Sequence, residues 1–440
     1  MKNRGLIALA GIGIHISIGS VYAWSVFSKP LQQAFGWNLK QANFTFGLAI
    51  FTLGISAALM GHVVERRGPR FSGSLSALLW ATGLLGSAFA TSGHIACEEL
   101  RLWLLYLCYG LIGGFGLGTG YITPVSTLMK WFPDHRGLAT GLAIMGFGFA
   151  SFLGAPLIGR LIEAQGISAT FAILGVVYLV VMLASALYLA PPPEGWQPAG
   201  YSGREDGPQV RRKPIDLMPM TANEAVKTPP FYGLWLMMFI NIGCGIAVIS
   251  VASPMTQELT GIDAVAAAAI VGMNGLFNGL GRLGWASLSD RIGRPNTYIA
   301  FFVLEILAFG CLPALRDILA FQALLYLIMT CYGGGFSTLP AYIGDLFGMR
   351  QVGAIHGYVL TAWALAGITG SSLAAYLREE TGSYGDMMRI FALVFLLALG
   401  AAIVMRGFVR RELARKHLGY AEVEGDALEV AVSESETGNG

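Results

Sequence analysis

The chain has 440 residues, of which 55% are hydrophobic and 12% are charged. A soluble domain carries about 25% charged residues, so this composition, with a mean hydropathy of +0.61, excludes an ordinary soluble protein. The formal net charge of +2 points to no class of partner. The five cysteines show no paired spacing, and neither a disulfide framework nor a metal site is predicted.

Apolar stretches of about 20 residues, the length that crosses a bilayer as a helix, recur along the whole chain. They predict an all-α membrane protein with twelve transmembrane helices. The predicted spans are 6–28, 42–64, 71–91, 103–129, 138–160, 168–190, 231–257, 264–286, 297–315, 319–345, 353–377 and 387–406. The first stretch lacks the small-residue cleavage pattern of a signal peptide, so we expect it to be retained as a span.

A polar stretch rich in proline, glycine and charge divides these spans six and six. We therefore expect an N-terminal half at 1–190, a linker at 191–230, a C-terminal half at 231–406 and a tail at 407–440. Most of the 28 lysines and arginines fall on the side that holds the linker and both termini. Basic loops are retained in the cytoplasm, so we expect cytoplasmic termini in a multi-pass protein of the plasma or inner membrane.

The two halves repeat one another at the turn after their second span. Glu65 and Arg66 stand there in the first half, and Asp290 and Arg291 in the second, each pair followed by a turn with glycine and arginine. An acid in such a turn can cap a helix N-terminus or pair with a neighbouring basic residue. We expect these four residues to form a conformational latch. Repeated six-helix halves are typical of transporters that rock around a midplane site.

Arg282 is the one charged residue in the apolar stretch 264–286, and Asn274 and Asn278 precede it at four-residue intervals. This spacing puts the three side chains on one helix face. A charge at such depth costs a few kcal/mol and usually faces a cavity or a partner. The pattern suggests a site for a small anion; the alternative is a structural arginine that snorkels or pairs with a carboxylate on another helix.

The duplicated turn resembles the best-known motif of the major facilitator superfamily, and the likeness covers about residues 5–406. Within that superfamily the chain is most similar to the oxalate:formate antiporter family and the related monocarboxylate transporters. The segments 19–25, 130–141 and 278–282 carry this likeness. The resemblance implies a fold of two pseudo-symmetric six-helix halves and a function in transport.

The resemblance also implies roles for single residues. The arginine of the eighth span binds the substrate carboxylate in these families, and Arg282 matches it. Animal monocarboxylate transporters have a proton-coupling aspartate four residues earlier, where this chain has Asn278. Oxalate exchangers have a lysine in span 11, where this chain has Trp363, and the stretch 353–377 contains no lysine or arginine. One cation balances one carboxylate, so a monoanion is expected rather than oxalate.

Other candidates follow from the spans that line the pathway in this fold. Tyr121 in the fourth span and Tyr332 in the tenth can donate a hydrogen bond to a carboxylate, or can simply pack. Phe336 and Trp363 can wall the apolar end of a substrate, or belong to an ordinary core.

Three titratable residues within the spans are candidates for proton coupling. His15 in the first span and His356 near the start of the eleventh can carry a proton at physiological pH. Glu305 lies in the ninth span, which is peripheral in this fold, and a neutral or paired structural role is its alternative.

These features predict a secondary active transporter of small monocarboxylates (lactate, pyruvate or formate) that works by alternating access, as a proton symporter or an anion exchanger. The alternatives are an oxalate:formate-type antiporter and a carrier of an unrelated small molecule. No P-loop or catalytic set occurs, so we expect no enzyme and no cofactor. The expected partners are the organic anion, protons and the lipid bilayer; we expect a monomer and no binding to nucleic acid.

Overall fold

The computed structural model describes residues 2–132, 136–193, 196, 216–262, 264–315 and 317–437. All regular structure within these residues is helical, as the composition predicts. The elements are α1 (Arg4–Gly19), η1 (Ser20–Ala23), α2 (Ser25–Phe35), α3 (Leu39–Ala90), α4 (Glu98–Leu105), η2 (Tyr106–Gly113), α5 (Gly114–Trp131), α6 (Arg136–Tyr188), α7 (Ala222–Ala225), α8 (Pro229–Thr260), α9 (Ala264–Ile292), α10 (Arg294–Cys311), η3 (Leu312–Ala314), α11 (Ile318–Phe347), α12 (Val352–Val359), α13 (Thr361–Thr381) and α14 (Tyr384–Thr437).

Nine helical segments among the described residues are long and apolar enough to cross a membrane. Two of them hold two predicted spans each, because Gly68 and Gly166 turn the chain inside α3 and α6 with a φ of 81°. Glycine adopts this conformation without a steric penalty. Helix α9, which carries Arg282, is not among the nine. The number of crossings therefore stays a prediction.

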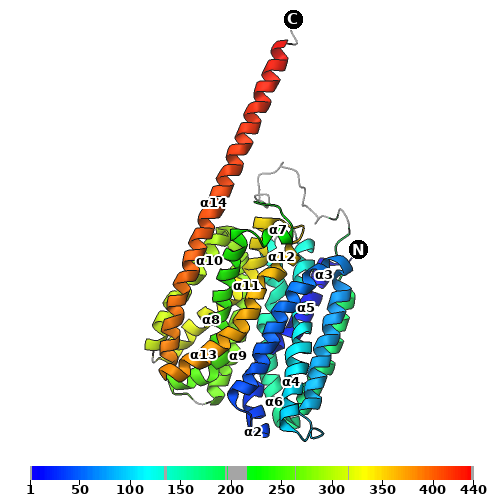
Figure 1. Ribbon diagram of the computed structural model, residues 1–440, viewed down its shortest axis with the longest axis vertical. Helices are drawn as coiled ribbons and strands as arrows, with labels where there is room; N and C mark the ends of the chain where they lie inside the picture. Colours follow the sequence, from blue (N-terminus) through cyan, green and yellow to red (C-terminus); the bar gives the residue numbers. More distant parts are fainter. Residues whose placement is uncertain are drawn as a thin grey trace.

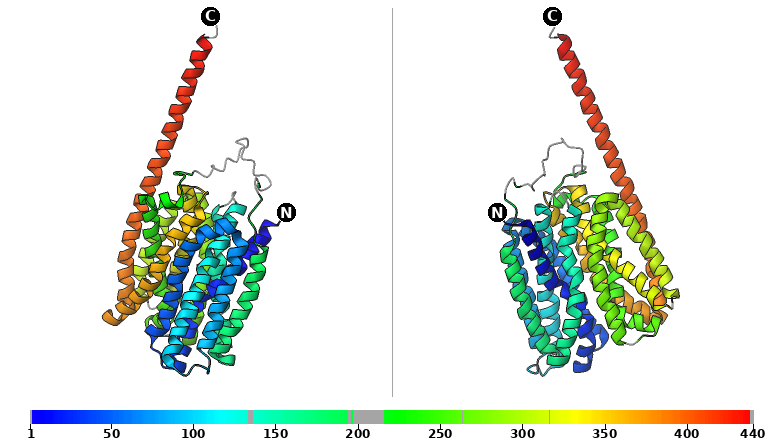
Figure 2. Two further views of the ribbon diagram at one scale, coloured as in Figure 1. Left: turned by 45° about the vertical axis from the view of Figure 1, so that its right-hand side comes forward. Right: turned by 180° about the vertical axis from the view of Figure 1, so that it is seen from behind.

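The elements α1–α6 form one bundle and α8–α14 a second, and the two lie side by side (Figures 1 and 2). Both termini and α7 are found at the same end of the molecule, and α14 extends beyond it (Figure 1). We call this the linker end, and the opposite end, where α2 lies, the far end. Helix α9 begins towards the far end and finishes at the linker end.

The two bundles meet closely where α6 of the first half crosses α9 of the second. A Cβ atom placed on Gly148 would lie 2.6 Å from the Cα atom of Gly279, so only glycine allows this approach of the two backbones. This close approach places the residues after Gly148 on α6 and after Gly279 on α9 at the boundary between the halves. Arg282, one turn after Gly279, is one of them.

Part of the predicted linker packs onto the second half. The Leu217 and Met218 N–H groups donate to the carbonyls of Asp345 (3.0 Å) and Leu346 (2.7 Å), which close α11. At the other boundary α14 continues from the last predicted span into the predicted tail, without a break up to Thr437.

Candidate substrate site

Arg282 lies between the two halves and bonds to both. Its side chain is fully buried. Nε donates to Oδ1 of Asn278 at 3.0 Å, and Nη1 donates to the backbone carbonyl of Ile144 on α6 at 3.3 Å. The remaining nitrogen, Nη2, has no hydrogen-bond partner among the described residues. The four-residue spacing therefore does bring Asn278 to Arg282, and leaves one guanidinium nitrogen available.

The charge of Arg282 is surrounded by rings rather than by acids. In the part of the chain that the structure describes, no carboxylate forms a salt bridge with it. Its Cζ atom lies 5.3 Å from the ring centre of Phe147 and 4.8 Å from that of Phe336, within the range of about 6 Å for a cation–π interaction. The rings hold the cation but cannot neutralise it.

Four aromatic residues from both halves pack around this charge. The Trp363 ring lies 5.0 Å from that of Tyr121, 5.6 Å from Phe147 and 4.7 Å from Phe336. We call these four residues the aromatic cluster. Phe336 lies beside Arg282, and both Phe336 and Trp363 lie beside Tyr121. Their rings provide an apolar wall next to a fixed cation.

Hydrogen-bond donors are in excess at this site. The Tyr121 hydroxyl, the Trp363 Nε1 and Arg282 Nη2 are buried and make no hydrogen bond of normal geometry with another described residue. The Tyr22 and Tyr332 hydroxyls form a hydrogen bond with each other at 2.6 Å. Because Tyr22 lies in η1 and Tyr332 in α11, this bond links the two halves. A buried donor without an acceptor costs about 1–3 kcal/mol. An anion would supply the missing acceptors and the missing negative charge together.

The histidines reach the aromatic cluster and the predicted glutamate does not. His15 Nε2 lies 3.0 Å from the carbonyl of Tyr121, and the two rings stack with their centres 5.3 Å apart. His356 is fully buried with its ring centre 6.1 Å from that of Tyr121, and neither ring nitrogen has a partner within the described ranges. Glu305 is buried in α10, near the thiols of Cys244 and Cys331.

The two copies of the turn motif make different contacts at the linker end. The Glu65 carboxylate lies beside the backbone of Gly353 and Ala354, at the start of α12 in the other half. A negative charge there complements the helix dipole. Glu65 therefore lies at the boundary between the halves. The Arg66 side chain that follows it is exposed.

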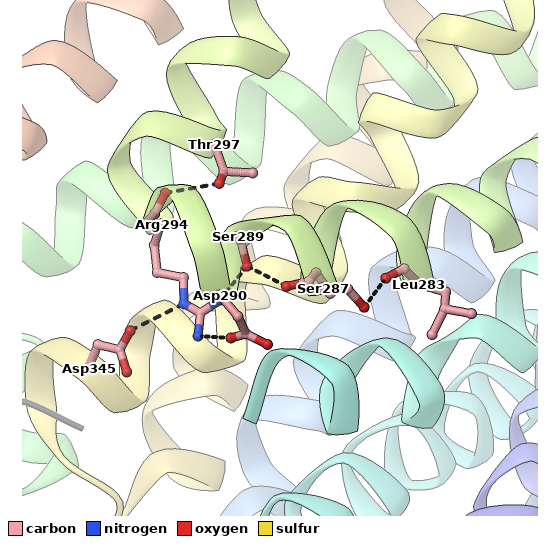
Figure 3. Close-up of polar contacts among 9 residues, drawn as sticks. Leu283, Ser287, Ser289, Asp290, Arg294, Thr297 and Asp345 are labelled. Atoms are coloured by element: carbon pink, nitrogen blue, oxygen red, sulfur yellow. Dashed lines mark hydrogen bonds and ion pairs between the residues drawn. The ribbon is translucent and has the colours of Figure 1, made fainter. Parts of the chain in front are cut away.

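Asp290 instead makes its contacts within the second half. It pairs with Arg294 at 2.5 Å, and Arg294 also pairs with Asp345 at 3.2 Å (Figure 3). Arg294 additionally donates to the Ser289 hydroxyl (Figure 3). Arg291 is exposed, so the predicted pairing of acid and arginine is made through Arg294.

Sequence reasoning did not identify three groups of this site: Phe147, Tyr22 and the carbonyl of Ile144. Phe147 is a single aromatic residue between two glycines, and Tyr22 lies in the segment 19–25 that resembles the transporter family. The likeness of segment 19–25 was a signal for Tyr22, whereas nothing in the sequence separates Phe147 from aromatic residues that only pack. The Ile144 carbonyl is a backbone group that no side-chain pattern reveals.

The structure thus brings two helical bundles together around one buried cation, Arg282. The sequence model of the Major Facilitator Superfamily matches residues 9–371, and the chain belongs to this family. It is thus a multi-pass membrane transporter and not an enzyme.

Among curated relatives, the oxalate:formate antiporter of Oxalobacter formigenes is 28% identical over 91% of each chain. The human monocarboxylate transporter 11 is 25% identical over 92% of this chain and 83% of its own length. The apicoplast pyruvate carrier 1 of Toxoplasma gondii is 24% identical over 69% and 65%, respectively. The names of these three relatives refer to small organic anions: oxalate and formate, monocarboxylates, and pyruvate.

Solved structures support the fold alone. The proton:xylose symporter XylE matches with a TM-score of 0.66 at 17% identity, over 92% of this chain and 96% of its own. The human organic anion transporter MFSD10 matches with a TM-score of 0.65 at 15% identity, over 91% and 100%. Both results confirm the predicted major facilitator fold.

Proposed function

We propose that the protein is a secondary active transporter of small monocarboxylate anions, with Arg282 as the anchor of the carboxylate. The observation that carries this proposal is Arg282 Nη2, a buried guanidinium nitrogen without a partner among the described residues, beside the equally unpartnered Tyr121 hydroxyl. A carboxylate accepts from two such donors at once, and charge-assisted bonds of this kind are the strong ones. Asn278 orients the guanidinium by accepting from its Nε.

The aromatic cluster favours a monoanion with a short apolar chain, such as lactate or pyruvate. Within the described residues, Arg282 is the one cation that contacts the cluster. The Trp363 indole occupies the position at which a second cation is expected in oxalate exchangers. Exchange of a dicarboxylate for a monocarboxylate is the second candidate, because an oxalate:formate antiporter is 28% identical to this chain.

Orientation and coupling complete the proposal. The linker end, where Glu65 and Asp290 lie, would face the cytoplasm with both termini, in the plasma or inner membrane of the cell. The protein would act as a monomer embedded in lipid. Transport would be proton symport or anion exchange, and His15 and His356, which lie beside Tyr121, are better placed than Glu305 to carry a proton.

Counterflow in proteoliposomes tests this function. Vesicles preloaded with lactate, pyruvate, formate, oxalate or xylose are given a trace of the labelled form of the same compound. Accumulation of labelled monocarboxylates, with less or none of oxalate and xylose, is the expected result. Accumulation of oxalate alone would favour the exchanger, and accumulation of no carboxylate would contradict an anion-binding role for Arg282.

A further inference from the structure

A second group of polar side chains lies on the far-end side of Asn278. A small cavity of about 20 Å³ is lined by Tyr22, Ser151, Asn274 and Asn278, together with apolar side chains. Ser151 comes from α6 and Asn274 from α9, so the cavity lies between the two halves. Its volume suits one or two groups of the size of a water molecule.

Asn274 is a buried amide to which the anion site gives no role. Its side chain is 5% exposed, and both Nδ2 and Oδ1 lack a hydrogen-bond partner among the described residues. A leucine of similar size would fill the same space without leaving polar atoms unsatisfied. The amide therefore points to a ligand that enters the cavity.

The chemistry of the cavity selects an uncharged ligand group. The Asn274 amide offers an NH₂ donor group and a carbonyl acceptor, and the Ser151 hydroxyl from α6 both donates and accepts. No charged side chain is among the described residues that line the cavity. A hydroxyl is an uncharged group that both donates and accepts.

We propose that this cavity is a subsite for a hydroxyl group carried by the transported monocarboxylate, with Asn274 and Ser151 as its hydrogen-bond partners. The inference rests on the proposed function of Arg282. Asn278 connects the two sites, because it lines the cavity and also accepts from Arg282 Nε at 3.0 Å.

The helix geometry sets the position of the hydroxyl on the substrate. Arg282 reaches back to Asn278, so a carboxylate bound to the guanidinium lies near the level of Asn278. Asn274 precedes Asn278 by four residues, which places it roughly 6 Å further along the helix axis from Arg282, at about 1.5 Å per residue. A hydroxyl on the carbon next to the carboxylate is too near to reach Asn274. A 3-hydroxy acid places its oxygen further out, so short 3-hydroxy monocarboxylates are the substrate class.

Competition in counterflow tests this specificity. In the wild type, 3-hydroxybutyrate should compete for uptake about two- to tenfold better than butyrate, the range of one neutral hydrogen bond. In Asn274→Leu this ratio should fall to about one, while butyrate itself competes as well as before. Ser151 belongs to the other half, and Ser151→Ala should also lower the ratio of 3-hydroxybutyrate to butyrate competition. This second variant keeps the test valid if Asn274→Leu fails to insert into the membrane.

Asn43→Leu is the matched control, because Asn43 lines a neighbouring cavity with Tyr22 and Trp24 and not this one. In this variant 3-hydroxybutyrate should compete better than butyrate by the same factor as in the wild type. The competition of lactate relative to propionate should be the same in every variant. An unchanged ratio in both Asn274→Leu and Ser151→Ala, or an equal loss in Asn43→Leu, would overturn the subsite. A wild type that transports butyrate without preferring its 3-hydroxy form also removes the subsite but leaves the proposed function standing. Failure to transport any carboxylate removes both.

Discussion

Tyr121 combines a buried hydroxyl that lacks a partner among the described residues with a ring that packs tightly. Tyr121→Phe removes the oxygen and keeps the ring, so it separates substrate binding from packing. A hydrogen bond to a charged group contributes about 1.5–3 kcal/mol. We therefore expect the dissociation constant of a transported monocarboxylate to rise by about tenfold or more in this variant, measured by calorimetry on purified protein.

The control for this change is Tyr342→Phe. The Tyr342 hydroxyl is also buried without a partner in the described part of the chain, but its ring packs near Tyr298 and outside the aromatic cluster. Its removal should leave the dissociation constant unchanged. If both variants bind like the wild type, Tyr121 is a packing residue.

Asn278 provides a test through pH. Its Oδ1 accepts from Arg282 Nε, so Asn278→Asp would place a carboxylate against the guanidinium. That salt bridge competes with the substrate until the new carboxylate is protonated. Uptake by the variant should therefore depend more strongly on acidic pH than uptake by the wild type. Initial rates are compared across pH at a fixed concentration of the substrate anion, and superimposable profiles would mean that residue 278 does not act on Arg282.

At the residue scale, contacts between side chains can be predicted from the sequence more readily than contacts made by backbone groups. Arg282 and Asn278 meet because a helix brings residues four apart together, and a lone charge in an apolar stretch is easy to recognise. Phe147 could not be told from the many aromatic residues that only pack. The Ile144 carbonyl depends on how closely α6 approaches α9, which is a property of the folded backbone.

At the scale of elements, the contact of Glu65 with the start of α12 joins the two halves, whereas Asp290 bonds within its own half. Glu65→Gln removes a charge–dipole interaction that contributes about 0.3–1 kcal/mol. Opening at the linker end should become about two- to fivefold more frequent. Hydrogen–deuterium exchange of the backbone at 351–360 measures this change.

Asp290→Asn is the matched comparison. Its contact with Arg294 is confined to the second half, so exchange at 351–360 should stay near the wild-type rate while the turn around Arg294 exchanges faster. Equal acceleration at 351–360 in both variants would show that the two motif copies act alike, against the asymmetry of their contacts.

Helices were predictable as elements because their apolar stretches are long. The interruptions within these helices were not predictable. The first predicted span, 6–28, ends its regular helix at Gly19, passes through η1 and begins α2 at Ser25. The fourth contains the π-helical segment η2. Such changes shift side chains by a fraction of a turn, and apolar composition is the same before and after them.

At the scale of the whole molecule, residues of both bundles contact the charged side chain of Arg282. Arg282 belongs to the second half and bonds Ile144 of the first, while Tyr332 of the second half bonds Tyr22 of the first. A substrate bound at Arg282 therefore contacts the surface along which the halves must move. A ligand shifts a conformational equilibrium by its difference in affinity between the two states, and this shared surface is where such a difference arises.

The central claim is that the Arg282 guanidinium binds the substrate carboxylate, and the dissociation constant of a transported monocarboxylate for Arg282→Lys tests it most directly. Lysine keeps the charge but lacks the planar pair of donors. Arg378→Lys is the control, because Arg378 pairs with Glu258 at 2.7 Å on a half-exposed surface. We predict at least about tenfold weaker binding for Arg282→Lys and wild-type binding for Arg378→Lys. Wild-type affinity in correctly folded Arg282→Lys protein would contradict the account.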